Sequence, residues 1–365
     1  MQVIVQARGH RAVTLPAIFL SGLVIALFSL GSRVAPAVAA EPTEFKVGIT
    51  SPEVTTFPVW MAEAGGFYKK QGLKVQIATI GGGTRGIQVL LSGDIQAMHV
   101  GLAPVAQANR QGADLRLIAS TSNTIPFTIF SPPAVKTAAD VKGGTAGITT
   151  FGSESDIAVT LALKQLGLTR KDVNVVQIGG NAERLAALMS GQVKAVPLLE
   201  PASSKARDLG FNPLVDLAAA KVPWVFNAIV VKRSYLESQR EVLTRFLKAY
   251  IEGAYLALSD EKGAKEVIRR EFKIDDAKVI SATYNDFRRL MPRDAEPSRA
   301  GAENVFEQLD AIGVPAGSKN LDDYVDTRII ESLKKDGFIT SLKQQYGIQS
   351  FHRGAHLFDY RVLRT

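Results

Sequence analysis

The chain has 365 residues, 46% of them hydrophobic and 21% charged, which is enough for two globular domains. Its formal net charge of +8 is scattered, without a lysine or arginine run, so a nucleic-acid-binding surface is not indicated. The absence of cysteine excludes disulfides, thiol nucleophiles and cysteine ligands of zinc.

Residues 1–40 have the pattern of a secretory signal. Basic residues near the N-terminus precede the almost uncharged stretch 12–31, and small residues follow it up to Ala40. We expect cleavage after Ala40 or Ala39 and a periplasmic protein. It is not expected to be a lipoprotein, because that class needs a cysteine at the cleavage point. An uncleaved membrane anchor is the alternative, since about 20 apolar residues can span a bilayer.

The first part of the mature chain alternates predicted strands with predicted helices. The strands are 45–50, 73–79, 95–101 and 115–121, and the helices are 59–70, 84–92 and one that Pro104 opens. Elements that alternate in this way build a mostly parallel sheet flanked by helices, which is the α/β class.

Segment 126–134 interrupts this alternation and is interpreted as a hinge crossing to a second lobe. The second lobe has predicted strands at 144–150, 173–179 and 193–199 and predicted helices at 154–167, 182–190 and 201–209. A return strand is predicted at 222–232, with helices at 239–259, 261–271, 276–290, 299–312 and 326–336 that cover the first lobe. The predicted divisions are signal 1–40, first lobe 41–125 and 222–345, crossing 126–134, second lobe 135–221, and a tail 346–365 of no assigned role.

Two stretches repeat each other at an offset of 98 residues. Residues 80–97 read IGGGTRGIQVLLSGDIQA, and residues 178–195 read IGGNAERLAALMSGQVKA. A repeat this long indicates two similar lobes rather than a stacked array. Two such lobes can face each other across a cleft and close on a small molecule.

Ligands of open α/β sheets bind beyond the carboxyl ends of the strands, where helix N-termini attract anions. Asn181 and Thr84 are expected to cap corresponding helices there. Arg85 is expected either to pair with a sulfonate or carboxylate, or to lie on the outer helix face. Glu200 is expected either to bind an amine or hydroxyl group, or to cap the next helix.

Three aromatic residues in loops, Phe57, Phe151 and Trp224, are candidates to cover the apolar part of a ligand. His99 lies within a strand pattern and is expected to be packed. His352 and His356 have a spacing found in metal sites, but no third ligand is evident, so no metal is predicted. No nucleophile elbow, zinc motif or dinucleotide fingerprint is present, which favours a binding protein without cofactors over an enzyme.

The sequence resembles the nitrate/taurine/alkanesulfonate group of solute-binding proteins of ABC importers, and the thiamine-precursor binders near it. The segments that carry the resemblance are VGIT followed by FPVWMAEAGGFYKKQGLKVQI within 47–77, GGGTRGIQVLLSGDIQAMHVG at 81–101, GTAGITTFGSESDIAVTLAL at 144–163 and LMSGQVKAVPLLEP at 188–201. The resemblance implies a two-lobed periplasmic-binding-protein fold of type II. It also implies capture of a small solute by hinge closure and delivery to an ABC permease and its ATPase. We expect the protein to be a monomer.

The resemblance further implies a set of sulfonate-binding positions in the loops: Thr50, Ser51, Thr56, Gly83, Thr84, Thr150, Ser153 and Ser155. Relatives that synthesise the thiamine pyrimidine carry a cysteine-rich motif, which this chain lacks. Two alternatives stay open. One is an enzyme of the same fold, either like that pyrimidine synthase or like a menaquinone-pathway lyase, and the other is a ligand sensor for a membrane receptor.

Overall fold

The structure, a computed structural model, describes residues 41–311, 313–314 and 317–348. The predicted signal segment 1–40 and residues 349–365 of the tail, with His352 and His356, lie outside the described residues. In the part of the chain that is described, no helix combines the length and the apolar character needed to cross a bilayer.

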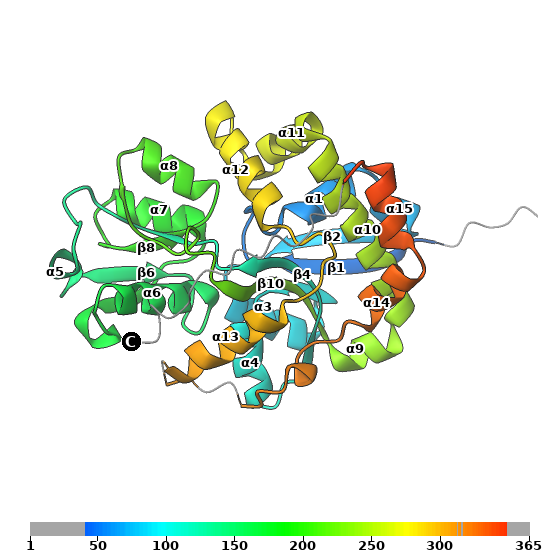
Figure 1. Ribbon diagram of the computed structural model, residues 1–365, viewed down its shortest axis with the longest axis horizontal. Helices are drawn as coiled ribbons and strands as arrows, with labels where there is room; N and C mark the ends of the chain where they lie inside the picture. The colour runs from blue at the N-terminus through cyan, green and yellow to red at the C-terminus, as the bar shows by residue number, and fades with distance from the viewer. Residues whose placement is uncertain (1–40, 312, 315–316, 349–365) are drawn as a thin grey trace, which may run out of the picture. The chain divides into compact units, whose positions relative to one another are not determined.

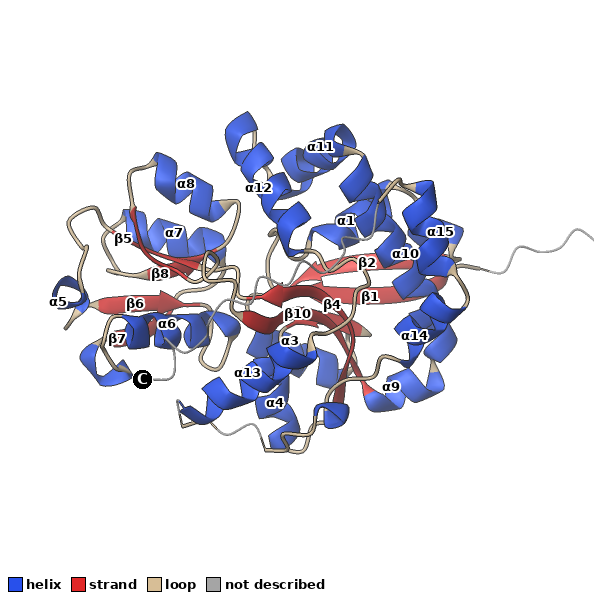
Figure 2. Ribbon diagram, viewed as in Figure 1, coloured by secondary structure: helices blue, strands red, loops and turns tan. Residues whose placement is uncertain are grey.

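Five strands form the first sheet in the order β2-β1-β3-β10-β4. They are β1 (Thr43–Ile49), β2 (Leu73–Thr79), β3 (Ala97–Val100), β4 (Leu115–Thr124) and β10 (Pro223–Lys232). Figure 2 labels β1, β2, β4 and β10 of this sheet. Strand β1 pairs in parallel with β2 and β3, as alternating strands and helices predict. Strand β10 returns from the second lobe and runs antiparallel between β3 and β4.

The second lobe repeats this arrangement. Its strands are β5 (Thr128–Ser131), β6 (Thr145–Ile148), β7 (Asn174–Gln177), β8 (Val196–Leu198) and β9 (Asn212–Asp216). Strands β6 and β7 are parallel, whereas β5 runs antiparallel between β8 and β9. A bridge from Ala146 to Ala195 joins the two groups. The resulting order β7-β6-β8-β5-β9 matches the first sheet strand for strand, as the sequence repeat predicts.

Helices cover both sheets (Figure 1). In the first lobe they are α1 (Phe57–Ala64), α2 (Phe67–Lys70), α3 (Gly83–Ser92) and α4 (Leu102–Arg110). In the second lobe they are α5 (Ala138–Val141), α6 (Glu154–Gln165), α7 (Asn181–Met189) and α8 (Ala202–Asp208), with a 3-10 turn at Arg170–Asp172. After β10 follow α9 (Arg233–Ser238), α10 (Arg240–Ser259), α11 (Glu261–Phe272), α12 (Ala277–Leu290), α13 (Arg299–Ala311), α14 (Arg328–Lys335) and α15 (Phe338–Gln345), with a 3-10 turn at Leu321–Asp323.

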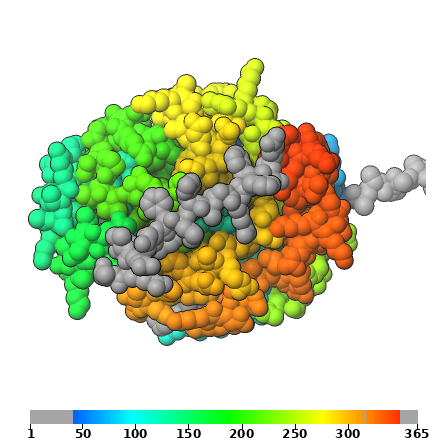
Figure 3. All heavy atoms as spheres, viewed as in Figure 1, coloured from blue at the N-terminus to red at the C-terminus, as the bar shows by residue number. Residues whose placement is uncertain are grey.

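Among the helices that follow β10, α10 contacts α1 and α13 contacts β10. Helix α10 packs against α1 so closely that a Cβ on Gly253 would lie 2.5 Å from the backbone nitrogen of Ala62. On the same side the ring of Phe45 stacks on that of Phe246 with 4.5 Å between centroids. Figure 3 shows the orange and red surfaces of α13 to α15 on the face in view.

Packed apolar side chains also connect the two lobes. Ile148 and Ile157 of the second lobe belong to one buried cluster with Leu102 and Val105 of the first. Such burial stabilises the close approach of the lobes by about 25 cal/mol per Å² of apolar surface removed from water.

In the first lobe His99 is fully buried beside Tyr250, as predicted, and burial lowers its pKa to about 3.

The differences from the predicted elements are local. The predicted helix 59–70 is two helices, because Gly66 takes a left-handed conformation with φ 68° that ends α1. The predicted crossing 126–134 contains β5, which is hydrogen-bonded in the second sheet. The chain leaves the first sheet through 125–127 and returns through 217–222. The short elements α5, β9, α9 and α15 were not predicted.

Candidate functional site

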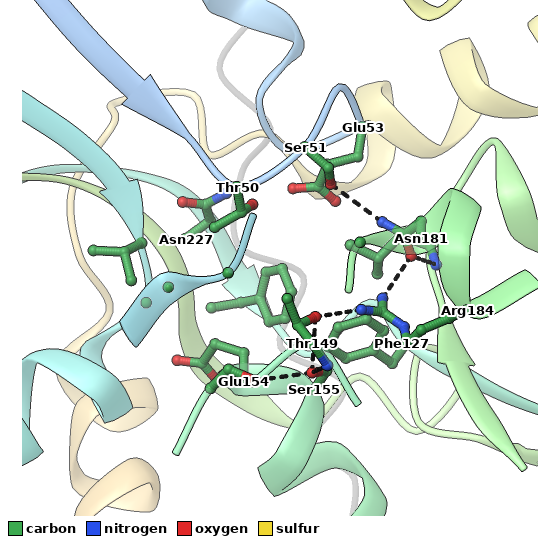
Figure 4. Close-up of a pocket in the computed structure, with 18 residues that line it drawn as sticks. Thr50, Ser51, Glu53, Phe127, Thr149, Glu154, Ser155, Asn181, Arg184 and Asn227 are labelled. Carbon is green, nitrogen blue, oxygen red and sulfur yellow. Dashed lines mark hydrogen bonds between the residues drawn. The ribbon is translucent and has the colours of Figure 1, made fainter. Parts of the chain in front are cut away.

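An inner cavity of about 50 Å³ lies where loops of the two lobes meet (Figure 4). The loops follow strands β1, β2, β3, β6, β7 and β8, so the cavity occupies the position that open α/β sheets offer to ligands. It is lined by Thr50, Ser51, Glu53, Gly82, Gly83, Val100, Gly101, Phe127, Thr149, Ser153, Glu154, Ser155, Gly180, Asn181, Arg184, Leu199, Phe226 and Asn227.

Arg184, in the first turn of α7, places a buried cation in the wall of this cavity. It is 2% exposed, and its Nε donates to the carbonyl oxygen of Pro197 at 2.9 Å. Its Nη1 donates to the Gly179 carbonyl oxygen at 2.8 Å and to Thr149 Oγ1, and its Nη2 donates to Asn181 Oδ1 at 2.9 Å.

All the acceptors of Arg184 are uncharged. Among the described residues, none of the ion pairs includes Arg184. Burial accordingly lowers the pKa of Arg184 to about 10, although the charge of Glu53 opposes this shift. A guanidinium that is held rigidly, buried and left without a carboxylate is prepared to bind an anion.

Hydroxyl groups at the start of α6 extend this wall. Ser155 Oγ donates to Thr149 Oγ1 at 3.0 Å and lies 2.8 Å from Ser153 Oγ. The backbone N–H of Thr149 donates to Ser155 Oγ at 2.8 Å. These contacts fix Thr149 where it accepts a hydrogen bond from Arg184, as Figure 4 shows.

Glu53 belongs to the loop that follows β1. The hydroxyl of Thr56 folds this loop by donating to the carbonyl oxygens of Ser51 and Glu53, both at 3.0 Å. Thr55 Oγ1 donates to Glu53 Oε1, and Asn227 Nδ2 donates to Thr55 Oγ1 at 2.7 Å. Glu53 is 2% exposed, and burial raises its pKa to about 7.

Glu154, at the start of α6, connects the second lobe with the first. Its carboxylate accepts from Trp224 Nε1 at 2.8 Å and from the backbone N–H of Ala103, in the first turn of α4, at 3.3 Å. Burial raises the pKa of Glu154 to about 8, against the lowering effect of these two donors. Its carboxylate is thus bound to the first lobe while its backbone belongs to the second.

An outer cavity of about 650 Å³ adjoins the inner one. Thr50, Ser51, Gly180 and Asn181 line both cavities. The outer cavity is lined further by the start of α8, by Phe272 at the end of α11 and by residues 273–276 before α12. A solute larger than the inner cavity can therefore extend outward between the lobes.

Six predicted site residues line the inner cavity: Thr50, Ser51, Gly83, Ser153, Ser155 and Asn181. Asn181 was expected to cap its helix, but its side chain accepts from Arg184 and from the backbone N–H of Leu199. Its role is therefore to hold the cation in place. Contact of these six residues with a ligand stays a prediction.

The aromatic candidates occupy other places. Phe57 is fully buried in the core, with its ring 5.1 Å from that of Phe287, and it cannot cover a ligand. Trp224 is also fully buried and binds Glu154. Phe151 is 51% exposed and does not line the inner cavity. Phe127 lies there instead, 6.0 Å from the guanidinium of Arg184.

The remaining candidates also do not line the inner cavity. Arg85 is exposed on α3, which agrees with the outer-face alternative. Glu200 forms an ion pair with Arg207 at 3.0 Å and accepts from the N–H of Ser204 in α8. Thr56 folds the loop after β1, and Thr84 donates to the carbonyl oxygen of Phe151 at 3.1 Å. Thr150 has a buried hydroxyl outside the residues that line the cavity.

Arg184, Glu53, Glu154 and Asn227 were not predicted. Arg184 lies three positions after Asn181 on the same helix face. The helical repeat alone could have placed it beside Asn181. No comparable sequence signal marks Glu53 or Glu154.

A sequence profile described as NMT1/THI5-like matches residues 54–264, more than half of the chain. The chain belongs to the NMT1/THI5-like family. A relative from Bacillus subtilis (strain 168), YtlA, which is named as a binding protein, is 24% identical over 264 residues. These cover 70% of this chain and 78% of YtlA.

Solved structures share the fold of this NMT1/THI5-like protein. The alkanesulfonate-binding protein SsuA from Xanthomonas axonopodis pv. citri, bound to MOPS, superposes with a TM-score of 0.66 at 19% identity, over 79% of this chain and 100% of SsuA. The desulfurization enzyme DSZB superposes with a TM-score of 0.58 at 15% identity, over 80% of this chain and 99% of DSZB. The predicted two-lobed periplasmic-binding-protein fold is confirmed, and both a solute-binding protein and an enzyme use it.

Proposed function

We propose that this protein is the periplasmic solute-binding component of an ABC importer and binds a small anionic solute between its lobes. The observation that carries the proposal is the buried guanidinium of Arg184, which lines the inner cavity without a carboxylate partner in the described residues. The solute would supply the missing negative charge through a sulfonate, carboxylate or nitrate-like group.

Hinge closure is the proposed means of capture, with the connections 125–127 and 217–222 as the hinge. The lobes touch through bonds that opening would break. Asn181 Nδ2 of the second lobe donates to Ser51 Oγ of the first at 3.4 Å, and Gln107 Nε2 of the first donates to the Gly152 carbonyl oxygen at 3.0 Å. A solute shifts the lobes toward closure only through contacts that it gains in the closed form.

Titration calorimetry with a panel of sulfonates, carboxylates and nitrate tests the anion anchor. Loss of a hydrogen-bonded charge contact costs about 1.5–3 kcal/mol, so Arg184→Gln should weaken binding about 10- to 150-fold. Arg85→Gln is the matched control, because this arginine is exposed on the neighbouring lobe, and it should bind as the wild type does. Equal affinities in all three proteins would remove Arg184 from the site.

An enzyme is the second candidate, because DSZB has the same fold. Incubation of the protein with each solute that binds, followed by mass spectrometry, separates the two functions. A transport component returns the solute unchanged, whereas turnover would establish the enzyme. Deletion of the gene should abolish high-affinity uptake of the same solute if delivery to a permease is its role.

A further inference from the structure

Two buried oxygens in the wall of the inner cavity have no hydrogen-bond partner among the described residues. They are Oε2 of Glu53 and Oδ1 of Asn227, in residues that are 2% and 3% exposed. The other polar atoms of both side chains are already used in one chain of bonds through Thr55. This chain fixes the two residues and leaves one acceptor free on each.

A buried acceptor without a donor costs about 1–3 kcal/mol, so such atoms in a cavity wall indicate what the occupant must provide. An ionised carboxylate only accepts hydrogen bonds, and so does an amide oxygen. The first-lobe wall therefore needs donors from the solute, whereas the positive charge of Arg184 in the second-lobe wall needs a negative group.

The charges around Glu53 point to the same chemistry. Asp286 of α12 and Arg184 of α7 are the charged groups whose fields act on the carboxyl of Glu53, and they oppose each other. Asp286 is itself paired with Arg289 at 2.5 Å. No lysine or arginine in the described residues forms an ion pair with Glu53, so a donor on the solute, above all a cationic one, meets a free carboxylate there.

We propose that Glu53, supported by Asn227, is the specificity-determining residue that selects solutes with an N–H group beside their acidic group. The inference rests on the proposed function, since it assumes that the acidic group of the solute binds Arg184. A simple anion satisfies only the second-lobe wall and brings its own oxygens toward the carboxylate of Glu53. Sites that hydrogen-bond a substrate N–H discriminate strongly against analogues without it, because the wall is then left unpaired.

Matched pairs of probes test this selection by titration calorimetry. The pairs are 2-aminoethanesulfonate with ethanesulfonate, 3-aminopropanoate with propanoate, and orotate with benzoate. Measurements at pH 8, above the pKa of about 7 at Glu53, keep most of this carboxyl ionised. In at least one pair the N–H-bearing member should bind at least tenfold more tightly to the wild type.

Variants assign the difference to Glu53. Glu53→Ala should reduce the affinity for the N–H-bearing member to that for its partner, whereas Glu53→Gln, which keeps one carbonyl oxygen, should retain part of the preference. Glu63→Ala, at an exposed glutamate of α1, is the matched control and should keep the full preference. Circular dichroism and the melting temperature of each variant verify folding.

The outcomes separate this inference from the proposed function. If both members of every pair that binds do so equally, and Arg184→Gln weakens both, the role of Glu53 is refuted and the anion-binding function stands. If no member of any pair binds the wild type, both are refuted. A preference that persists unchanged in Glu53→Ala also overturns the inference.

Discussion

Replacement of Glu154 by alanine tests how the closed arrangement of the lobes is held. The carboxylate joins α6 of the second lobe to Trp224 Nε1 and to the N–H of Ala103 in the first. In an open form this carboxylate moves away with its lobe, and water reaches the two donors. In Glu154→Ala, closure must instead bury the N–H of Trp224 without an acceptor.

A buried donor left unpaired costs about 1–3 kcal/mol, and each 1.4 kcal/mol is a factor of ten in affinity. Glu154→Ala should therefore weaken solute binding about 5- to 150-fold in titration calorimetry. Glu154→Gln keeps a carbonyl acceptor for Trp224 and should lose less. Small-angle scattering should show that the solute compacts both variants only at higher concentration than the wild type.

The pH dependence supplies a second readout. Because burial raises the pKa of Glu154 from 4.5 to about 8, the closed form binds more protons than an open form with an ordinary carboxyl. This contribution to closure is complete below pH 4.5 and is lost as the pH rises toward 8. Glu53 titrates at a lower pH, with a pKa of about 7, so the loss of affinity as the pH approaches 8 is assigned to Glu154 and should vanish in Glu154→Gln. Wild-type affinity and pH dependence in both variants would refute the reasoning.

Three further substitutions have expected outcomes. Gly82→Ala should weaken solute binding far more than Gly191→Ala. Both glycines have positive φ, so the strain on the backbone is similar. A Cβ at Gly82 would lie 2.9 Å from a side chain of the second lobe, whereas a Cβ at Gly191 would meet nothing within 4 Å. Equal calorimetric affinities of the two variants would contradict a role of Gly82 in the approach of the lobes. Gly253→Ala should lower the free energy of unfolding by about 1–3 kcal/mol in denaturant titrations, because its Cβ would overlap the backbone of Ala62, and an unchanged midpoint would argue against this packing. The pKa of His99 is about 3 in the folded chain and 6.5 as the ordinary value, so between these pH values the unfolded chain binds a proton at His99 that the folded chain does not. The free energy of unfolding of His99→Leu should therefore exceed that of the wild type by a growing amount as the pH falls from 6.5 toward 3. A difference that stays constant with pH would disprove this.

The sequence predicted the fold well where the signal is periodic and local. Alternating strands and helices and the 98-residue repeat are sufficient to predict two similar lobes, because each unit must bury one apolar face. Elements of four to eight residues, such as α5 and α15, were missed since short segments carry too few periods to stand out. The break between α1 and α2 depends on one backbone dihedral at Gly66, which the sequence marks only as a glycine pair.

The site was predicted less completely. Loop positions such as Ser153 and Asn181 follow from the rule that ligands bind beyond strand ends, and they line the inner cavity. The charge of Arg184 and the free acceptor of Glu53 depend on burial and on partners distant in sequence, which no local pattern encodes. Trp224 was predicted to lie in a loop and to cover a ligand. In the structure it is fully buried, and its Nε1 donates to Glu154.

The position of β10 limits when the protein can assemble. This strand lies between β3 and β4, yet it follows β4 by about a hundred residues, so the first sheet cannot join β3 to β4 until the second lobe has been synthesised. Pairings between such distant segments cost loop-closure entropy and form slowly. Completion of the first sheet therefore depends on a strand that is synthesised only after the whole second lobe.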